Sequence, residues 1–70
     1  MTPEEAVREV LARSDEPLHW TVIQDRALRE GLIDPFETSD VKRAVIGALR
    51  AMVADGRVVK SARGTYALAG

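Results

Sequence analysis

Signals for starting and stopping helices recur along the sequence and divide it into three helical segments followed by a β-rich end. Thr2-Pro3-Glu4-Glu5 combines an N-cap residue, a proline suited to the first helical turn and a glutamate placed for a capping box. Pro17 ends that segment, because the residue before a proline avoids the α-helical region. Gly31 and Asp55-Gly56 are typical of helix C-termini. We therefore expect helices over residues 3–14, 21–30 and 39–54.

The starts of the second and third helices are defined unequally by the sequence. Leu18-His19-Trp20 is expected to form a short extended piece ahead of the second helix. Thr21 then follows as the expected N-cap, with Gln24 completing a capping box. Thr38, Ser39 and Asp40 are three consecutive candidates for the third N-cap, so that start is certain while its register stays open.

The last segment has the pattern of a β-hairpin. Arg57-Val58-Val59-Lys60 and Thr65-Tyr66-Ala67-Leu68 are rich in β-formers and flank the turn Ser61-Ala62-Arg63-Gly64. Gly64 is expected to supply the positive φ that closes this turn. The sequence thus predicts a two-stranded hairpin across residues 57–68.

Apolar residues at helical spacing predict a small core within one domain, residues 1–70. At 70 residues and 46% apolar composition, the chain can bury only about 60% of its unfolded surface, so it has to use that core fully. The expected core residues are Val7, Val10, Leu11, Leu18, Ile23, Leu28, Val45, Leu49, Met52, Tyr66 and Leu68.

The composition excludes several kinds of chemistry. The chain has no cysteine and one histidine, which removes disulfides, thiolate zinc sites, cysteine nucleophiles and multi-histidine metal sites. No nucleophile is spaced from His19 as in a catalytic site, and the paired carboxylates lie at helix ends, where capping explains them. Trp20 is expected to pack in the core rather than stack on a nucleobase. We expect no enzyme, no metal ion and no cofactor.

No segment suggests a membrane or a secretory signal. The uncharged runs are far shorter than the roughly 20 apolar residues of a membrane span. The N-terminus is acidic, unlike the basic start of a signal peptide. The expected location is the cytoplasm.

Charge is divided unevenly between the two parts of the sequence. Residues 1–40 hold four Arg against ten acidic residues, a net charge of −6. Residues 41–70 hold six Lys and Arg against one acid, Asp55, a net charge of +5. A basic second half favours contact with nucleic acid, and an ordinary solvated surface is the alternative.

Helix, short strand, helix, turn, helix and hairpin is the element order of a winged helix-turn-helix, an α+β fold. In this fold the third helix enters the DNA major groove, and the hairpin, called the wing, lies along the backbone. The positive charge of the chain falls on these two elements, with Lys42 at the flank of the helix. The candidate DNA-binding residues are Lys42, Arg43, Gly47, Arg50, Lys60 and Arg63.

Each candidate residue has an expected role beside a plain structural alternative. Arg43 and Arg50 lie seven residues apart on one helix face, where either could reach a guanine edge. Gly47 between them would let a DNA backbone or a partner chain approach, although a glycine inside a helix costs about 1 kcal/mol. Lys60 and Arg63 are candidates for phosphate contact. The alternative is a set of solvated basic side chains and an unselected glycine.

Several stretches of the chain together form a known pattern. They are Glu16–Ile23, Leu28–Leu32, Thr38–Asp40, Gly56–Val59 and Arg63–Leu68. This pattern resembles the HARE winged-helix family, in which a Pro-Leu-His-aromatic stretch precedes the second helix, a Thr starts the third, and Arg-Gly-Thr-Tyr-x-Leu ends the domain. The resemblance covers about Val7 to Leu68, with Ser39 where the family often has proline.

The resemblance implies a DNA-binding module, for plain or modified duplex DNA. Members of the HARE family are modules of chromatin proteins, of restriction and DNA-modification enzymes, and of the delta subunit of bacterial RNA polymerase. The implied context is transcription regulation, DNA modification or restriction. Some members bind protein, and the acidic first half, Ile46 and Val53 favour that alternative here. We expect double-stranded DNA or a protein as partner and no membrane. The sequence leaves the oligomeric state open, with a monomer favoured.

Overall fold

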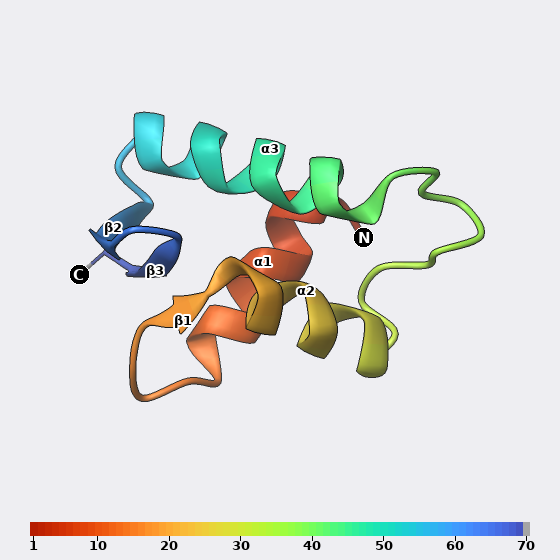
Figure 1. The fold of residues 1–70 in the computed structure, drawn as a ribbon, viewed down its shortest axis with the longest axis horizontal. Coiled ribbons are helices and arrows are strands. Elements are labelled where there is room, and N and C mark those ends of the chain that lie inside the picture. The colour runs from red at the N-terminus through yellow and green to blue at the C-terminus, as the bar shows by residue number, and fades with distance from the viewer. Residues whose placement is uncertain (70) are drawn as a thin grey trace.

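The structure is a computed structural model of the chain, and it describes residues 1–69. Three helices pack together, and a small sheet lies beside the C-terminal end of the third (Figure 1). The elements are α1 (Pro3–Ala12), β1 (Leu18–His19), α2 (Trp20–Arg29), α3 (Val41–Ala54), β2 (Val58–Ala62) and β3 (Thr65–Leu68). The α+β class and the winged helix-turn-helix order are those predicted.

The sheet joins the wing to the start of α2. Its antiparallel strand order is β1-β3-β2, and Leu18 of β1 pairs with Tyr66 of β3. The predicted hairpin is confirmed, but β2 continues to Ala62, two residues further than expected. An irregularity in the pairing between Lys60 and Ala62 lets the strand continue, which leaves a shorter turn than the predicted one.

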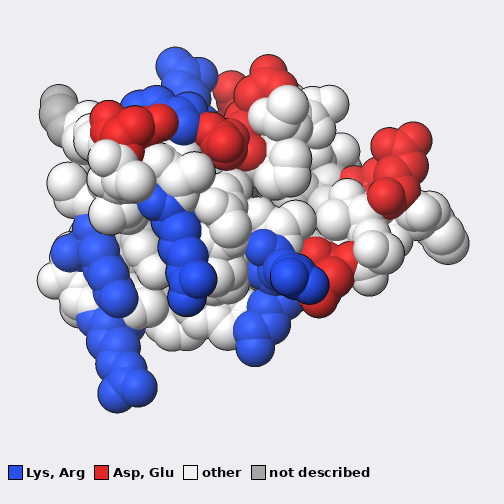
Figure 2. All heavy atoms as spheres, turned by 90° about the horizontal axis from the view of Figure 1, so that it is seen from above, with Lys and Arg blue, Asp and Glu red and all other residues white. Residues whose placement is uncertain are grey.

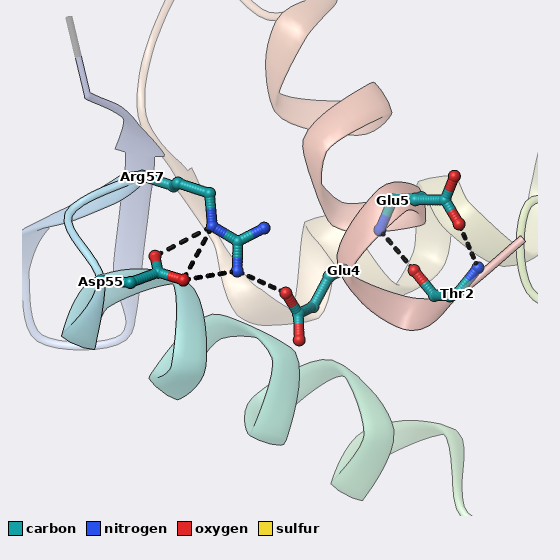
Figure 3. Close-up of polar contacts among 5 residues, drawn as sticks. All are labelled: Thr2, Glu4, Glu5, Asp55 and Arg57. Carbon is teal, nitrogen blue, oxygen red and sulfur yellow. Dashed lines mark hydrogen bonds and ion pairs between the residues drawn. The ribbon is translucent and has the colours of Figure 1, made fainter.

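The start of α1 is the capping box that the sequence predicts (Figure 3). The Glu5 backbone N–H donates to Thr2 Oγ1 at 3.1 Å, and the Thr2 backbone N–H donates to Glu5 Oε1 at 2.9 Å. The donated Thr2 N–H favours the charged carboxylate and so lowers the pKa of Glu5. The helix ends at Ala12, two residues before the expected end.

The predicted N-cap of α2 is wrong. The helix begins at Trp20, and its N-cap is His19, whose Nδ1 accepts from the Thr21 backbone N–H at 3.3 Å. Thr21 is inside the helix because the β1–β3 pairing holds His19 extended and ends there. The helix ends at Arg29, one residue before the expected end, and Gly31 follows the C-cap as predicted. Gly31 has a φ of 70°, and its N–H donates to the Leu28 carbonyl.

Asp40 is the N-cap of α3 among the three candidates. One of its carboxylate oxygens accepts from the Arg43 backbone N–H at 3.0 Å, so the helix begins at Val41 rather than at residue 39. This register buries one face of the helix and leaves the opposite face in solvent. The buried residues of α3 are Val45, Ala48, Leu49 and Met52.

The core largely follows the predicted set. Nine of the eleven expected residues are buried, and Leu28 is half-buried against them. The prediction that Leu68 is a core residue is wrong, since 36% of its surface is exposed. It lies two residues beyond Tyr66, past the part of β3 that β1 pairs with, at the end of the sheet. The core also includes Ala6, Ala27, Ile33, Ala48 and Val58.

Arg57 is a structural residue that links the segment between α3 and β2 to the start of α1 (Figure 3). Its Nε donates to Asp55 Oδ1 at 2.9 Å, and its Nη2 contacts Glu4 at the start of α1. Glu4 therefore pairs with an arginine 53 positions away. The guanidinium lowers the pKa of Asp55, and the Asp55 and Glu4 carboxylates raise the pKa of Arg57.

Candidate nucleic-acid interface

The exposed face of α3 carries the predicted residues. Lys42, Arg43, Gly47 and Arg50 are all exposed. Arg43, Gly47 and Arg50 lie on the side of the helix opposite the buried stripe, and Lys42 lies at its flank. An added Cβ at Gly47 would meet no atom within 4 Å. Gly47 thus leaves an open position on this face, where a partner backbone could come close.

A groove of about 670 Å³ lies between α3 and the wing. The structure brings three of the predicted cations to it, namely Arg50 from α3, Lys60 from β2 and Arg63 from the turn. The other residues that line it are His19, Trp20, Ile46, Val53, Ala54, Gly64 and Tyr66. The groove therefore combines apolar side chains with three positively charged ones.

These cations are free of acidic partners within residues 1–69. The ion pairs of that part of the chain involve Arg13, Arg29 and Arg57. Arg57 is neutralised by Asp55 and Glu4. Of the six basic residues after position 40, five remain unpaired there: Lys42, Arg43, Arg50, Lys60 and Arg63.

The charge is separated across the surface. Figure 2 shows the molecule from the side of α3, with Lys and Arg side chains over the helix and the wing. Towards the end where the wing lies, uncharged surface separates these basic side chains, whereas acidic side chains lie along the upper edge of this view and towards its right end. The overall charge of −1 thus conceals a basic area over α3 and the wing.

Arg43 and Lys42 lie outside the groove. Arg43 lines a separate hollow with Glu37, Thr38, Ser39, Asp40 and Ala44 at the start of α3. The Lys42 Nζ lies 5.2 Å from the centroid of the Trp20 ring, a cation–π distance. Lys42 therefore has a contact that sequence reasoning missed, because it joins α3 to α2 through space.

Trp20 has two roles in the structure. It packs against the core as predicted, and it also lines the groove. The exposed His19 lies beside it, with ring centroids 5.7 Å apart and planes tilted by 35°. The sequence placed both residues ahead of a helix but contained no sign that the wing would come against them.

Gly64 is a close contact between the wing and the start of α2. Its φ is +73°, as predicted, and its carbonyl accepts from the Trp20 backbone N–H at 2.9 Å. A Cβ at this position would lie 2.8 Å from His19 Nε2. The glycine is therefore required both by its backbone conformation and by the imidazole beside it.

Gly64→Ala is expected to lower the free energy of unfolding by about 1–2 kcal/mol through the left-handed backbone alone. The displaced imidazole of His19 adds to this cost. Gly47→Ala is the matched control, expected to stabilise by about 1 kcal/mol because its site is an open helical position. Urea unfolding of both variants measures the difference. Equal effects of the two substitutions would contradict the left-handed conformation of Gly64.

The side chains and helices of residues 1–69 form neither a metal-site cluster nor a membrane-spanning helix. No three His, Cys, Asp or Glu side chains gather there into a group that could hold a metal ion. Of the helices in that range, none is both long enough and apolar enough to cross a membrane.

Comparison with known proteins supplies the family. No curated protein and no solved structure matches the chain significantly. The model of the HARE-HTH family, whose description names ASXL proteins and a restriction endonuclease helix-turn-helix domain, matches residues 1–70. The match spans α3, the wing and the groove between them. The chain therefore belongs to the HARE-HTH family of helix-turn-helix DNA-binding domains.

Proposed function

We propose that this chain is a single winged-helix module, residues 1–70, that binds double-stranded DNA through α3 and the wing. The observation that carries the proposal is the groove between these elements. Arg50, Lys60 and Arg63 meet there without an acidic partner in residues 1–69. Unpaired cations are free to replace the counterions of DNA phosphates, which is the main source of affinity for a duplex.

The proposed roles follow from the element that holds each residue. Arg50 on α3 reaches base edges in the major groove, where a guanidinium pairs with guanine through two hydrogen bonds. Lys60 and Arg63 in the wing contact the phosphate backbone. Lys42 and Arg43 extend the positive surface along α3, and Gly47 lets the duplex approach the helix.

The biological context is proposed from the family alone. A DNA-binding module of this kind serves transcription regulation, or a DNA-modification or restriction system, and its duplex is plain or modified. The module itself carries no catalytic role in this proposal. Cytoplasmic localisation stays a prediction from the sequence.

Arg50→Ala is expected to weaken duplex binding and to relax sequence preference by about 1–3 kcal/mol at the base pair it reads. Lys60→Ala should weaken binding to all sequences alike, since a phosphate contact carries no sequence information. Fluorescence anisotropy with a panel of labelled plain and modified duplexes measures both effects.

Arg8→Ala is the matched control for these variants. Arg8 is an exposed arginine of α1, so its loss changes the net charge as Arg50→Ala does but leaves the groove intact. Its effect on affinity should be small beside that of the groove variants. Equal losses for Arg8→Ala and Arg50→Ala would mean that only overall charge matters, against a specific site.

A protein-binding function is the second candidate. The groove is partly apolar: Ile46 and Val53 line it, and 38% of Val53 is exposed. In that case no duplex, plain or modified, would bind at about 50 mM salt. Ile46→Asp would then abolish capture of a protein partner, whereas Arg8→Ala would not.

A further inference from the structure

The loop between α2 and α3 presents a fully exposed aromatic side chain. Phe36, the only phenylalanine of the chain, is 98% exposed. Apart from the terminal Met1, the other large apolar residues that are exposed in residues 1–69 show 36–48% of their surface. An aromatic ring in this position adds nothing to the core, and rigid aromatic side chains are the usual anchors of protein interfaces.

Hydrogen bonds from Asp34 shape the turn that carries Phe36. Asp34 Oδ1 accepts from the Phe36 backbone N–H at 2.8 Å. The Asp34 carbonyl accepts from the backbone N–H of Glu37 at 3.1 Å and of Thr38 at 2.9 Å. The aromatic ring is thus displayed on a defined turn, which lowers the entropy cost of inserting it into a site.

The same loop is acidic. Residues 34–40 hold Asp34, Glu37 and Asp40 and no basic residue. A complementary site would therefore combine an apolar hollow with several unpaired cations. The groove between α3 and the wing has this composition, with Trp20 and Tyr66 beside its three basic side chains.

One chain cannot place its own loop in its own groove. The loop precedes the first turn of α3, whereas the groove runs from Ile46, in the middle of the helix, to the wing at its C-terminal end (Figure 1). Arg50, the basic residue of α3 in the groove, lies nine residues, or about 14 Å, along the helix from Val41. The loop of one molecule can therefore reach only the groove of another.

We propose that the loop of residues 34–40 docks in the groove between α3 and the wing of a second copy of this chain. The Phe36 ring enters the groove, and the acidic side chains of the loop face its cations. The contact is head-to-tail, so each copy keeps one free loop or groove and further copies can add. Its area is small and its ion pairs are exposed, so the association is weak.

This inference goes beyond DNA binding and does not require it. The loop and the duplex would compete for one groove, since Arg50, Lys60 and Arg63 serve both. Self-association then holds the module in a DNA-free form at high local concentration, and a bound duplex releases the loop.

Sedimentation equilibrium between about 20 µM and 1 mM protein, at low salt, tests the proposal. The apparent mass of the wild type should rise with concentration, and added salt should reverse the rise. Phe36→Ser should weaken association at least about tenfold, because the Phe36 ring, once inserted into the groove of the second copy, supplies most of the apolar surface buried by the contact. Val22→Ser is the matched control, an exposed valine of α2 outside the groove, and should associate as the wild type does.

Mixing two defective variants tests the head-to-tail geometry. Phe36→Ser keeps an intact groove, and Arg50→Glu keeps an intact loop. Each should associate more weakly than the wild type when alone, and their mixture should form a complex of one copy of each that grows no further. Circular dichroism of each variant verifies that it is folded.

Each of three results would overturn the inference. The wild type could stay monomeric at about 1 mM protein and low salt, Phe36→Ser could associate as strongly as the wild type, or the two variants could form no complex when mixed. Phe36→Ser should bind duplex DNA as the wild type does, because Phe36 lies outside the groove. Association without DNA binding would refute the proposed function alone, and DNA binding without association would refute this inference alone.

Discussion

Leu49→Ala is expected to lower the free energy of unfolding by about 2–5 kcal/mol. Leu49 is fully buried on α3, within the core that joins all three helices and the sheet. Its truncation removes apolar contacts and leaves a cavity that neighbouring side chains fill only in part. Stability of about 0.05–0.15 kcal/mol per residue makes this a large share of the total for a chain of 70 residues.

Leu68→Ala is the matched control for that experiment. It makes the same chemical change at a site that is 36% exposed at the end of the sheet. The cost should be clearly smaller than that of Leu49→Ala, since about a third of Leu68 is already in water and its truncation leaves no closed cavity. Urea unfolding at 25 °C measures both variants. A loss below about 1 kcal/mol for Leu49→Ala would show that the register of α3 is wrong.

Local signals account for what the sequence predicted well. The capping box of Thr2 and Glu5 forms within four residues, and the C-terminal turn at Gly31 forms within six. Such contacts depend on the nearest residues only, so they can be identified without knowledge of the fold. The order of helices and hairpin followed from them, and the winged-helix arrangement followed from that order.

Contacts between distant segments account for the errors. His19 replaces Thr21 as the N-cap of α2 because β3, more than 40 residues later, pairs with β1 and holds it extended. Leu68 shares a sheet face with Tyr66 by alternation, but β1 is too short to pair beyond Tyr66. Neither the partner strand nor its length can be read from the local sequence.

In the candidate interface, too, the features that depend on local sequence were predicted and those that depend on distant contacts were not. The helical period of 3.6 residues correctly placed Arg43 and Arg50 on the exposed side of α3. Periodicity does not say where the wing will lie along the helix. Seven residues span about 10 Å, which is enough to put Arg50 in the groove and Arg43 beside the acidic loop. The contact of Lys42 with Trp20 likewise depends on how α3 crosses α2.

The salt dependence of duplex binding is the second large effect expected, and it counts the phosphate contacts. Five contacts, one for each unpaired cation of α3 and the wing, give a slope of log K against log salt of about −4.5. Contacts from Arg50, Lys60 and Arg63 alone give about −3. Between about 50 and 200 mM salt, affinity should then fall roughly 500-fold in the first case and roughly 50-fold in the second.

Arg43→Ala decides between the two slopes. Arg43 lies apart from the groove, in a hollow that it shares with Glu37 and Asp40, whose negative charges oppose the approach of a phosphate although neither forms an ion pair with it. If Arg43 nevertheless contacts a phosphate, its removal should reduce the magnitude of the slope by about 0.9, as removal of Lys60 should in either case. An unchanged slope after Arg43→Ala would exclude a phosphate contact at Arg43, and the same result for Lys42→Ala would confine the electrostatic contact to the groove. A wild-type slope near zero would leave no phosphate contact at all, and the groove would then belong to a protein partner.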